Sequence, residues 1–295
     1  MVGRTRPGPV LITGCSSGIG RAAALRRQYG LPADRPRRLC RRDGYRGGAR
    51  LTRMVLVGMR IQQSGAATAP AVVLLHGSGR AGRMWGPALG GLSGEWHVLT
   101  PDLPGFGRSE GPFTVAGAVQ AVRDTIAVQT APVHLCGLSL GGVIAIRVAA
   151  QLGPQVASLV VTGTPVVPGR DLPAALRRFR RLPGPLLPLF SDVGGRQEWL
   201  RMLDELERTD LRDYLPQVTA PALVICGSRD WRAMPAACEL AGGLPDGRLW
   251  IAPHQGHSWP ATSPELFCKV VTEFIGMVVG AAGGTPGELA GAGRA

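Results

Sequence analysis

Residues 133–142 read VHLCGLSLGG, and this stretch decides the fold. The apolar run at 133–137 predicts a buried β-strand, and a helical pattern follows directly over 140–152. Between them lies Gly137-Leu138-Ser139-Leu140-Gly141, a Gly-x-Ser-x-Gly sequence. In the order strand, turn, helix, this sequence is typical of a nucleophile elbow, which presents a serine hydroxyl at the carboxyl edge of a sheet. The flanking glycines are expected because bulkier side chains would collide across so tight a turn.

Outward from this turn, short apolar runs alternate with helical patterns, which indicates a parallel sheet built from βαβ units. The pattern predicts strands at 55–61, 71–76, 96–100, 133–137, 157–163, 222–227 and 248–252. It predicts helices at 114–130, 140–152, 195–209, 233–242 and 264–279. We therefore assign residues 54–280 to the α/β class, with a doubly wound, mostly parallel sheet.

Two segments depart from this alternation. Residues 165–215 contain PGPLLP and the arginine-rich stretch RRFRR at 177–181, and they predict a small helical cap inserted over one edge of the sheet. The arginines of 177–181 could bind an anionic substrate group, although a solvated helix face is the favoured interpretation. Residues 281–295 are rich in glycine and alanine and are expected to form a flexible tail.

A serine hydroxyl attacks only with the help of a base, and the base needs an orienting acid. Five histidines are the candidate bases: His76, His97, His134, His254 and His257. Two of them, at 97 and 134, fall within or at the start of strands, where structural roles are usual. The chain order serine, acid, histidine favours the loop HQGHS after the last strand. Within it we predict His257 as the base, with His254 kept as the alternative.

The acid is expected after a strand that lies between the serine and the histidine. Asp230 ends the run ALVICGSRD and fits this place, whereas Asp171, Asp192, Asp204 and Asp213 in the cap are interpreted as surface carboxylates. The glycine-rich turn HGSGR at 76–80 follows another strand and frees backbone N–H groups. We predict an oxyanion hole formed by the backbone N–H groups of Ser78 and Leu140.

Together these motifs resemble the α/β-hydrolase superfamily over residues 54–279. The stretch DLPGFGRS at 102–109 and the terminal helix SPELFCKVVTEFI at 263–275 resemble the small capped serine esterases, lipases and peroxidase-like members. The resemblance implies that Asp102 and Arg108 shape the entrance of the site without taking part in catalysis. A serine at 139 argues against the dehalogenase and epoxide-hydrolase branches, which attack with aspartate.

The expected function is that of a serine hydrolase that cleaves a small ester, lactone or thioester through an acyl-enzyme. Four aromatic residues in loops near the predicted site suggest an apolar acyl pocket as a hypothesis, although aromatic residues in loops are as often packing residues: Trp85, Phe106, Trp231 and Trp259. Carbon–carbon bond hydrolysis and cofactor-free peroxidase chemistry use the same triad and remain alternatives. A non-catalytic binding protein on this fold is a further alternative, although it would not need all three residues.

The N-terminal segment contains a motif of a different enzyme class. LITGCSSGIGRAAALRR at 11–27 resembles the cofactor motif of short-chain dehydrogenases/reductases, but the resemblance stops there. Residues 31–50 contain no apolar run of four, and no tyrosine is followed by a lysine four residues later. A nicotinamide-dependent reductase is therefore the least favoured function. We expect residues 1–53 to be a disordered or non-native leader, from an upstream start or a shifted frame, with Met54 near the true beginning.

Net charge and cysteine content limit the partners, cofactors and compartments that we expect for this protein. The net charge is +13, of which residues 1–53 carry +11. Because the basic segment is short of aromatic residues, we expect no nucleic-acid partner. The six cysteines show no metal-ligand spacing, so no metal or cofactor is expected, and the cytoplasm is the expected compartment. No apolar run is long enough for a membrane span, and the oligomeric state is left open.

Overall fold

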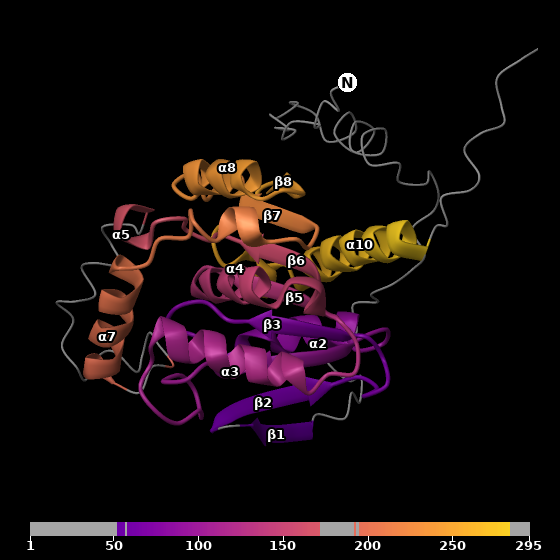
Figure 1. Cartoon of the computed structure of the whole chain (residues 1–295), viewed down its shortest axis with the longest axis horizontal. Helices are drawn as coiled ribbons and strands as arrows, with labels where there is room; N and C mark the ends of the chain where they lie inside the picture. The colour runs from indigo at the N-terminus through magenta and orange to yellow at the C-terminus, as the bar shows by residue number, and fades with distance from the viewer. Residues whose placement is uncertain (1–51, 57, 172–191, 193–194, 284–295) are drawn as a thin grey trace, which may run out of the picture.

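The computed structural model describes residues 52–56, 58–171, 192 and 195–283. One eight-stranded sheet runs through this part of the chain in the order β1-β2-β4-β3-β5-β6-β7-β8 (Figure 1). The strands are β1 Thr52–Leu56, β2 Met59–Ser64, β3 Ala71–Leu75, β4 His97–Pro101, β5 Val133–Leu138, β6 Val156–Thr162, β7 Ala222–Gly227 and β8 Gly247–Ala252. Strand β2 pairs antiparallel with β1 and β4, and all other pairs are parallel. The predicted α/β class and mostly parallel sheet are confirmed.

Helices cover both faces of the sheet. They are α2 Gly86–Leu92, α3 Val115–Ala127, α4 Leu140–Leu152, α5 Pro168–Asp171, α7 Arg196–Glu207, α8 Met234–Gly243, α9 Trp259–Thr262 and α10 Pro264–Gly283. Helices α3, α4 and α8 contribute to one buried cluster, and α2 and α10 contribute to a second one. The central strands are apolar along their whole length because both of their faces are covered.

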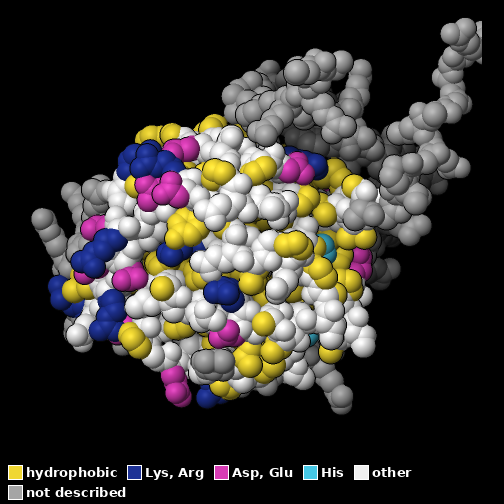
Figure 2. Space-filling model, in the orientation of Figure 1, with side chains coloured by type: hydrophobic (Ala, Val, Ile, Leu, Met, Phe, Trp, Pro, Cys, Tyr) yellow, Lys and Arg dark blue, Asp and Glu magenta, His cyan; other side chains and the backbone are white. Residues whose placement is uncertain are grey.

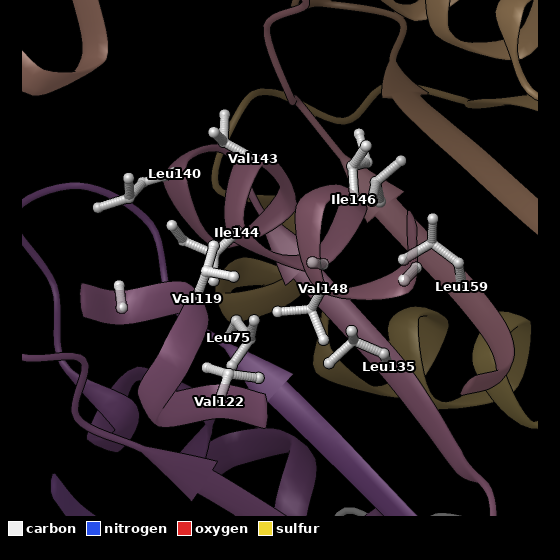
Figure 3. Packing of buried hydrophobic residues seen from close by; sticks show 14 of the residues in the cluster. Leu75, Val119, Val122, Leu135, Leu140, Val143, Ile144, Ile146, Val148 and Leu159 are labelled. Atoms are coloured by element: carbon white, nitrogen blue, oxygen red, sulfur yellow. The ribbon is translucent and has the colours of Figure 1, made fainter. Parts of the chain in front are cut away.

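The larger cluster packs helix side chains directly onto the middle of the sheet (Figure 3). Leu75, Leu135 and Leu159 come from the neighbouring strands β3, β5 and β6, and each is fully buried. Val122 of α3 and Val148 of α4 belong to the same cluster. Only Ser139 lies between β5 and α4, so the packing of these two elements also determines the position of Ser139.

The expectation of a single strand over 55–61 is wrong. The structure forms a hairpin there, in which Leu56 of β1 pairs with Met59 of β2. Gly58 lies in the turn at φ +77°, a conformation that glycine adopts without strain. An isolated glycine inside an apolar run therefore marks the turn. Strand β1 begins at Thr52, ahead of Met54, and α10 continues to Gly283, beyond the predicted start of the tail.

Charged side chains of both signs are intermixed on the face shown in Figure 2. Ion pairs among the described residues include Arg170–Glu239 at 2.7 Å and Arg212–Asp210 at 2.5 Å. The basic stretch 177–181 and residues 1–51 of the leader lie outside the described residues. No helix in the described ranges is long and apolar enough to cross a bilayer.

Two histidines in the strands are structural, as predicted. His97 Nε2 contacts Gln63 Oε1 at 2.9 Å, and His134 Nδ1 contacts Ser158 Oγ at 2.9 Å. Burial lowers the pKa of His134 to about 4 and also lowers the pKa of His97. Both imidazoles are therefore neutral in the folded protein at neutral pH.

This burial makes the stability of the fold sensitive to acid. A histidine in the unfolded chain titrates near pH 6.5, so between pH 6.5 and 4 the unfolded state binds more protons at His134. The free energy of unfolding therefore falls as the pH falls through this window. The parent protein should lose free energy of unfolding between pH 7 and pH 5. We expect His134→Gln to make this loss smaller by about 2 kcal/mol, measured by urea denaturation at both pH values. The exposed His254→Gln is the control, and an equal loss in both variants would contradict the assignment.

Candidate active site

The site is built around the turn that joins β5 to α4. Ser139 is the one residue between them, with φ 53° and ψ −111°. Backbone in so sparsely populated a region costs about 1–3 kcal/mol and is kept only where the surroundings impose it. Here the Ser139 N–H donates to Thr162 O at 2.9 Å, and the N–H groups of Gly142 and Val143 donate to Ser139 O. The serine is thus fixed between two strands and the helix N-terminus.

Glycines on both sides of this serine allow the backbone to close up. A Cβ atom at Gly137 would collide with the backbone of Gly141. One at Gly141 would collide with Leu75 O, which belongs to the adjacent strand β3. No side chain could be accommodated without moving main-chain atoms, so the Gly-x-Ser-x-Gly pattern is a packing requirement here.

A carboxylate and an imidazole meet beside the turn. Asp230 lies in the loop after β7 and His257 in the loop after β8, and Asp230 Oδ2 contacts His257 Nδ1 at 2.7 Å. Because the carboxylate accepts, Nδ1 carries the proton and Nε2 keeps a free lone pair. Gly163, which follows β6 at φ +56°, packs against the same ring. This arrangement orients the imidazole from two sides.

A third loop, after β3, supplies backbone donors. His76 is fully buried; its Nδ1 donates to Gly77 O at 3.0 Å, and its Nε2 accepts from Leu103 N at 3.0 Å. Burial lowers the pKa of His76, which keeps the ring in the neutral form that this pair of bonds requires. Among the described residues, no group accepts a hydrogen bond from the N–H of Ser78 or Leu140. Both N–H groups are therefore available to a ligand.

These loops surround one pocket of about 450 Å³. Four predicted site residues line it: Ser78, Ser139, Asp230 and His257. The fifth, Leu140, directly follows the lining residue Ser139. No hydrogen bond joins Ser139 to His257 among the described residues, although such bonds commonly tighten only when substrate is present. A hydroxyl, an imidazole and a carboxylate at one pocket can activate an oxygen nucleophile.

Comparison with known proteins decides the family. A model of the alpha/beta hydrolase family matches residues 72–270. The chain belongs to the α/β-hydrolase family. It is 32% identical over 231 residues to a pimeloyl-[acyl-carrier protein] methyl ester esterase of Stenotrophomonas maltophilia, covering 64% of this chain and 86% of the relative. It is 29% identical over 255 residues to a relative from Yersinia enterocolitica named for carbamate hydrolysis, covering 72% of this chain and 90% of the relative.

Solved structures show the same fold at lower identity. A thermophilic esterase from Thermogutta terrifontis superposes with a TM-score of 0.64 at 22% identity, covering 78% of this chain and 99% of that one. An enol-lactonase from Burkholderia xenovorans superposes with a TM-score of 0.62 at 23% identity, covering 76% and 100%. These structures show the fold, whereas the family match and the named relatives of higher identity show that the chain is a hydrolase of this family.

The alternative base of this α/β hydrolase lies apart from the site. His254 is exposed, adopts φ +61°, and uses its N–H to donate to Ser228 Oγ at 2.8 Å. It is not among the described residues that line the pocket, and Asp230 pairs with His257. The geometry therefore favours His257 over His254.

The expectation that four loop aromatics form an apolar pocket is wrong for three of them. Trp85 and Trp259 are each 1% exposed and pack against Phe267 in the core. Phe106 is equally buried, against His76. A loop position in the sequence does not reveal on which side of the loop the core lies. Of the four, only the exposed Trp231 lines the pocket.

The family resemblance places two residues at the entrance of the site, outside the catalytic group. Asp102 and Arg108 are absent from the described lining of the pocket. The Asp102 carboxylate instead accepts from the N–H of Gly82 at 2.8 Å and of Arg108 at 2.9 Å. It therefore ties the loop after β4 to the segment before α2.

Sequence reasoning missed three arginines of the pocket: Arg80, Arg229 and Arg232. The available signal was their closeness in sequence to predicted site residues, since RDWR at 229–232 surrounds the acid. No group of three or more potential metal ligands occurs in the described ranges.

Proposed function

We propose that this α/β hydrolase cleaves a small carboxylic ester, lactone or thioester through an acyl-enzyme on Ser139. One observation carries the proposal: an Asp230–His257 pair and a serine held in a strained turn line the same pocket. The family relationship supports it, because the relatives named above include ester hydrolases.

In the first half of the reaction, His257 Nε2 takes the proton of the Ser139 hydroxyl as the oxygen attacks the carbonyl carbon. The N–H groups of Ser78 and Leu140 stabilise the oxyanion of the tetrahedral intermediate, and each such donor is typically worth about 3 kcal/mol. When the intermediate collapses, the bond to the leaving oxygen or sulfur breaks and that atom takes the proton from His257. The product of this half is the acyl-enzyme.

In the second half, His257 removes a proton from water, and the resulting hydroxide attacks the acyl carbon. The bond to Ser139 breaks, the serine oxygen takes the proton back, and the carboxylic acid leaves. Asp230 keeps its hydrogen bond to Nδ1 throughout and stabilises the imidazolium that forms in each half. The same steps apply to the carbonyl group of a carbamate, and the Yersinia enterocolitica relative is named for carbamate hydrolysis.

The cytoplasm remains the proposed compartment. In the described part of the chain, no disulfide joins the four cysteines: Cys136, Cys226, Cys238 and Cys268. Reduced thiols are the usual state in a reducing environment. This supports the location expected from the sequence.

The proposal is tested by treating the folded protein with a fluorophosphonate probe and locating the modified residue by mass spectrometry. We expect stoichiometric phosphonylation of Ser139, because only an activated serine reacts quickly with such a probe. Ser258 lines the same pocket and is the internal comparison for simple accessibility. A folded sample without adduct at Ser139 would contradict the acyl-enzyme mechanism and favour a binding protein on this fold.

A further inference from the structure

Three arginines at the pocket have no acidic partner among the described residues. Arg80 lies in the loop after β3, and Arg229 and Arg232 lie in the loop after β7. All three line the pocket and have exposed side chains. In the ranges that the structure describes, no aspartate or glutamate forms an ion pair with any of them. Their positive charge is therefore left for solvent or a ligand.

The two carboxylates that line the pocket are already engaged. Asp230 is bound to His257. Asp171 accepts from the N–H groups of Val166 and Val167 at 2.9 and 3.0 Å and pairs with Arg170 at 2.6 Å. Neither is free to neutralise the three arginines, so positive charge exceeds negative charge at the described wall of the pocket.

The backbone around these arginines is held in place. Arg80 N–H donates to Gly77 O at 3.2 Å, and Arg229 N–H donates to Gln255 O at 2.8 Å. The guanidinium carbon of Arg232 lies 5.0 Å from the ring centre of Trp231. Stacking on an aromatic face restricts a guanidinium while leaving its N–H edge free for a planar or tetrahedral oxyanion. The backbone of Arg80 and Arg229 thus has a defined position on two walls of the site, and the Arg232 guanidinium stacks on Trp231.

We propose that this pocket selects substrates that carry a second, anionic group, a carboxylate or a phosphate, which Arg80, Arg229 and Arg232 bind. The inference rests on the proposed function, since it concerns the part of the substrate away from the scissile carbonyl. Guanidinium groups bind both oxyanions in a bidentate manner. The anion can belong to the acyl group or to the leaving group, and the two cases are separable by experiment.

The test compares kcat/KM within two matched pairs of substrates at low ionic strength. The acyl-side pair is the p-nitrophenyl monoester of adipic acid and p-nitrophenyl hexanoate, which have acyl chains of equal length. The leaving-group pair is acetyl-coenzyme A, which carries phosphates, and the neutral thioester S-acetyl-N-acetylcysteamine. We expect the anionic member of one pair to be preferred about tenfold, given that exposed charge pairs are individually weak. The preference should shrink in about 0.5 M salt.

Variants assign the preference to the arginines. The double variant Arg229→Gln/Arg232→Gln should lose most of the preference, and Arg80→Gln should lose part of it. The double variant Arg229→Lys/Arg232→Lys should keep part of the preference, because it retains the charge and loses the bidentate geometry. Arg60→Gln is the matched control: Arg60 is exposed on β2, near the opposite edge of the sheet, and does not line the pocket. It should leave the preference unchanged.

The outcomes separate the two proposals. A preference within the adipate pair assigns the anion to the acyl group, and one within the thioester pair assigns it to the leaving group. Equal turnover of charged and neutral members would overturn the charge selection and leave the acyl-enzyme mechanism standing. A preference that persists in the double glutamine variant would also overturn it. No turnover of any of the four substrates would overturn the proposed function together with the inference.

Discussion

Replacing Ser139 with alanine is expected to lower kcat/KM for p-nitrophenyl acetate by about 10⁴-fold or more. The substitution removes the hydroxyl oxygen of the proposed nucleophile. It leaves the backbone bonds to Thr162, Gly142 and Val143 in place. Alanine and serine meet similar strain at φ 53°, so the stability of the fold should change little. The measurement is steady-state hydrolysis, with thermal unfolding recorded on the same samples.

Ser258→Ala is the matched control, since Ser258 lines the same pocket and directly follows His257. It removes one hydroxyl from the site without removing the proposed nucleophile. Its kcat/KM should stay within about threefold of the parent, as for a substitution that leaves the reacting groups in place. If Ser139→Ala kept more than a tenth of the parent activity, the nucleophile would have to be another group.

The second large effect is expected at a residue that has no reactive group. Gly163→Ala should lower kcat by about 100-fold, because a Cβ there would lie 2.8 Å from Cε1 and 2.9 Å from Nδ1 of His257. The ring would have to move, and its bond to Asp230 would be distorted. Alanine is also disfavoured at φ +56°, which should reduce stability by about 1 kcal/mol.

Gly58→Ala separates these two causes. Gly58 also has a positive φ, +77°, but a Cβ there would meet nothing within 4 Å. The hairpin variant should therefore show the backbone strain without the loss of kcat. Comparable losses of kcat in both variants would mean that the effect at Gly163 is a general one. Full activity of Gly163→Ala would mean that the position of His257 does not matter for the reaction.

The central elements could be predicted from the sequence because each has a local cause. Helix α4 occupies 140–152 as predicted. The glycine-containing turn before it determines where the helix begins, and its long apolar pattern determines which face packs on the sheet. Helix α2 was not predicted. Its sequence GPALGGL contains three glycines, and its helicity depends on burial of Ala88, Leu89 and Leu92 against the sheet and α10. That burial is a tertiary effect, which a local pattern does not record.

The same distinction applies to the site. Ser139, Asp230 and His257 each follow a strand of a parallel sheet, so their convergence at one edge follows from topology. The character of the pocket wall does not follow in this way. Trp259 was expected in the wall, but its indole N–H donates to Thr162 Oγ1 at 2.8 Å inside the core. The arginines that line the wall are ordinary charged loop residues until the fold brings the loops after β3 and β7 together.

The backbone conformation of Ser139 also has a practical consequence. A φ of 53° with ψ −111° is rare in a free chain, and here it depends on contacts from β3, β6 and α4. An unfolded or misfolded molecule would carry the same hydroxyl in an unreactive setting. With Ser139 as the proposed nucleophile, a covalent titrant of this serine would count native molecules within a preparation, whereas absorbance counts every chain. The titre recorded along a heating ramp would follow the loss of correctly assembled protein even when aggregation obscures optical signals.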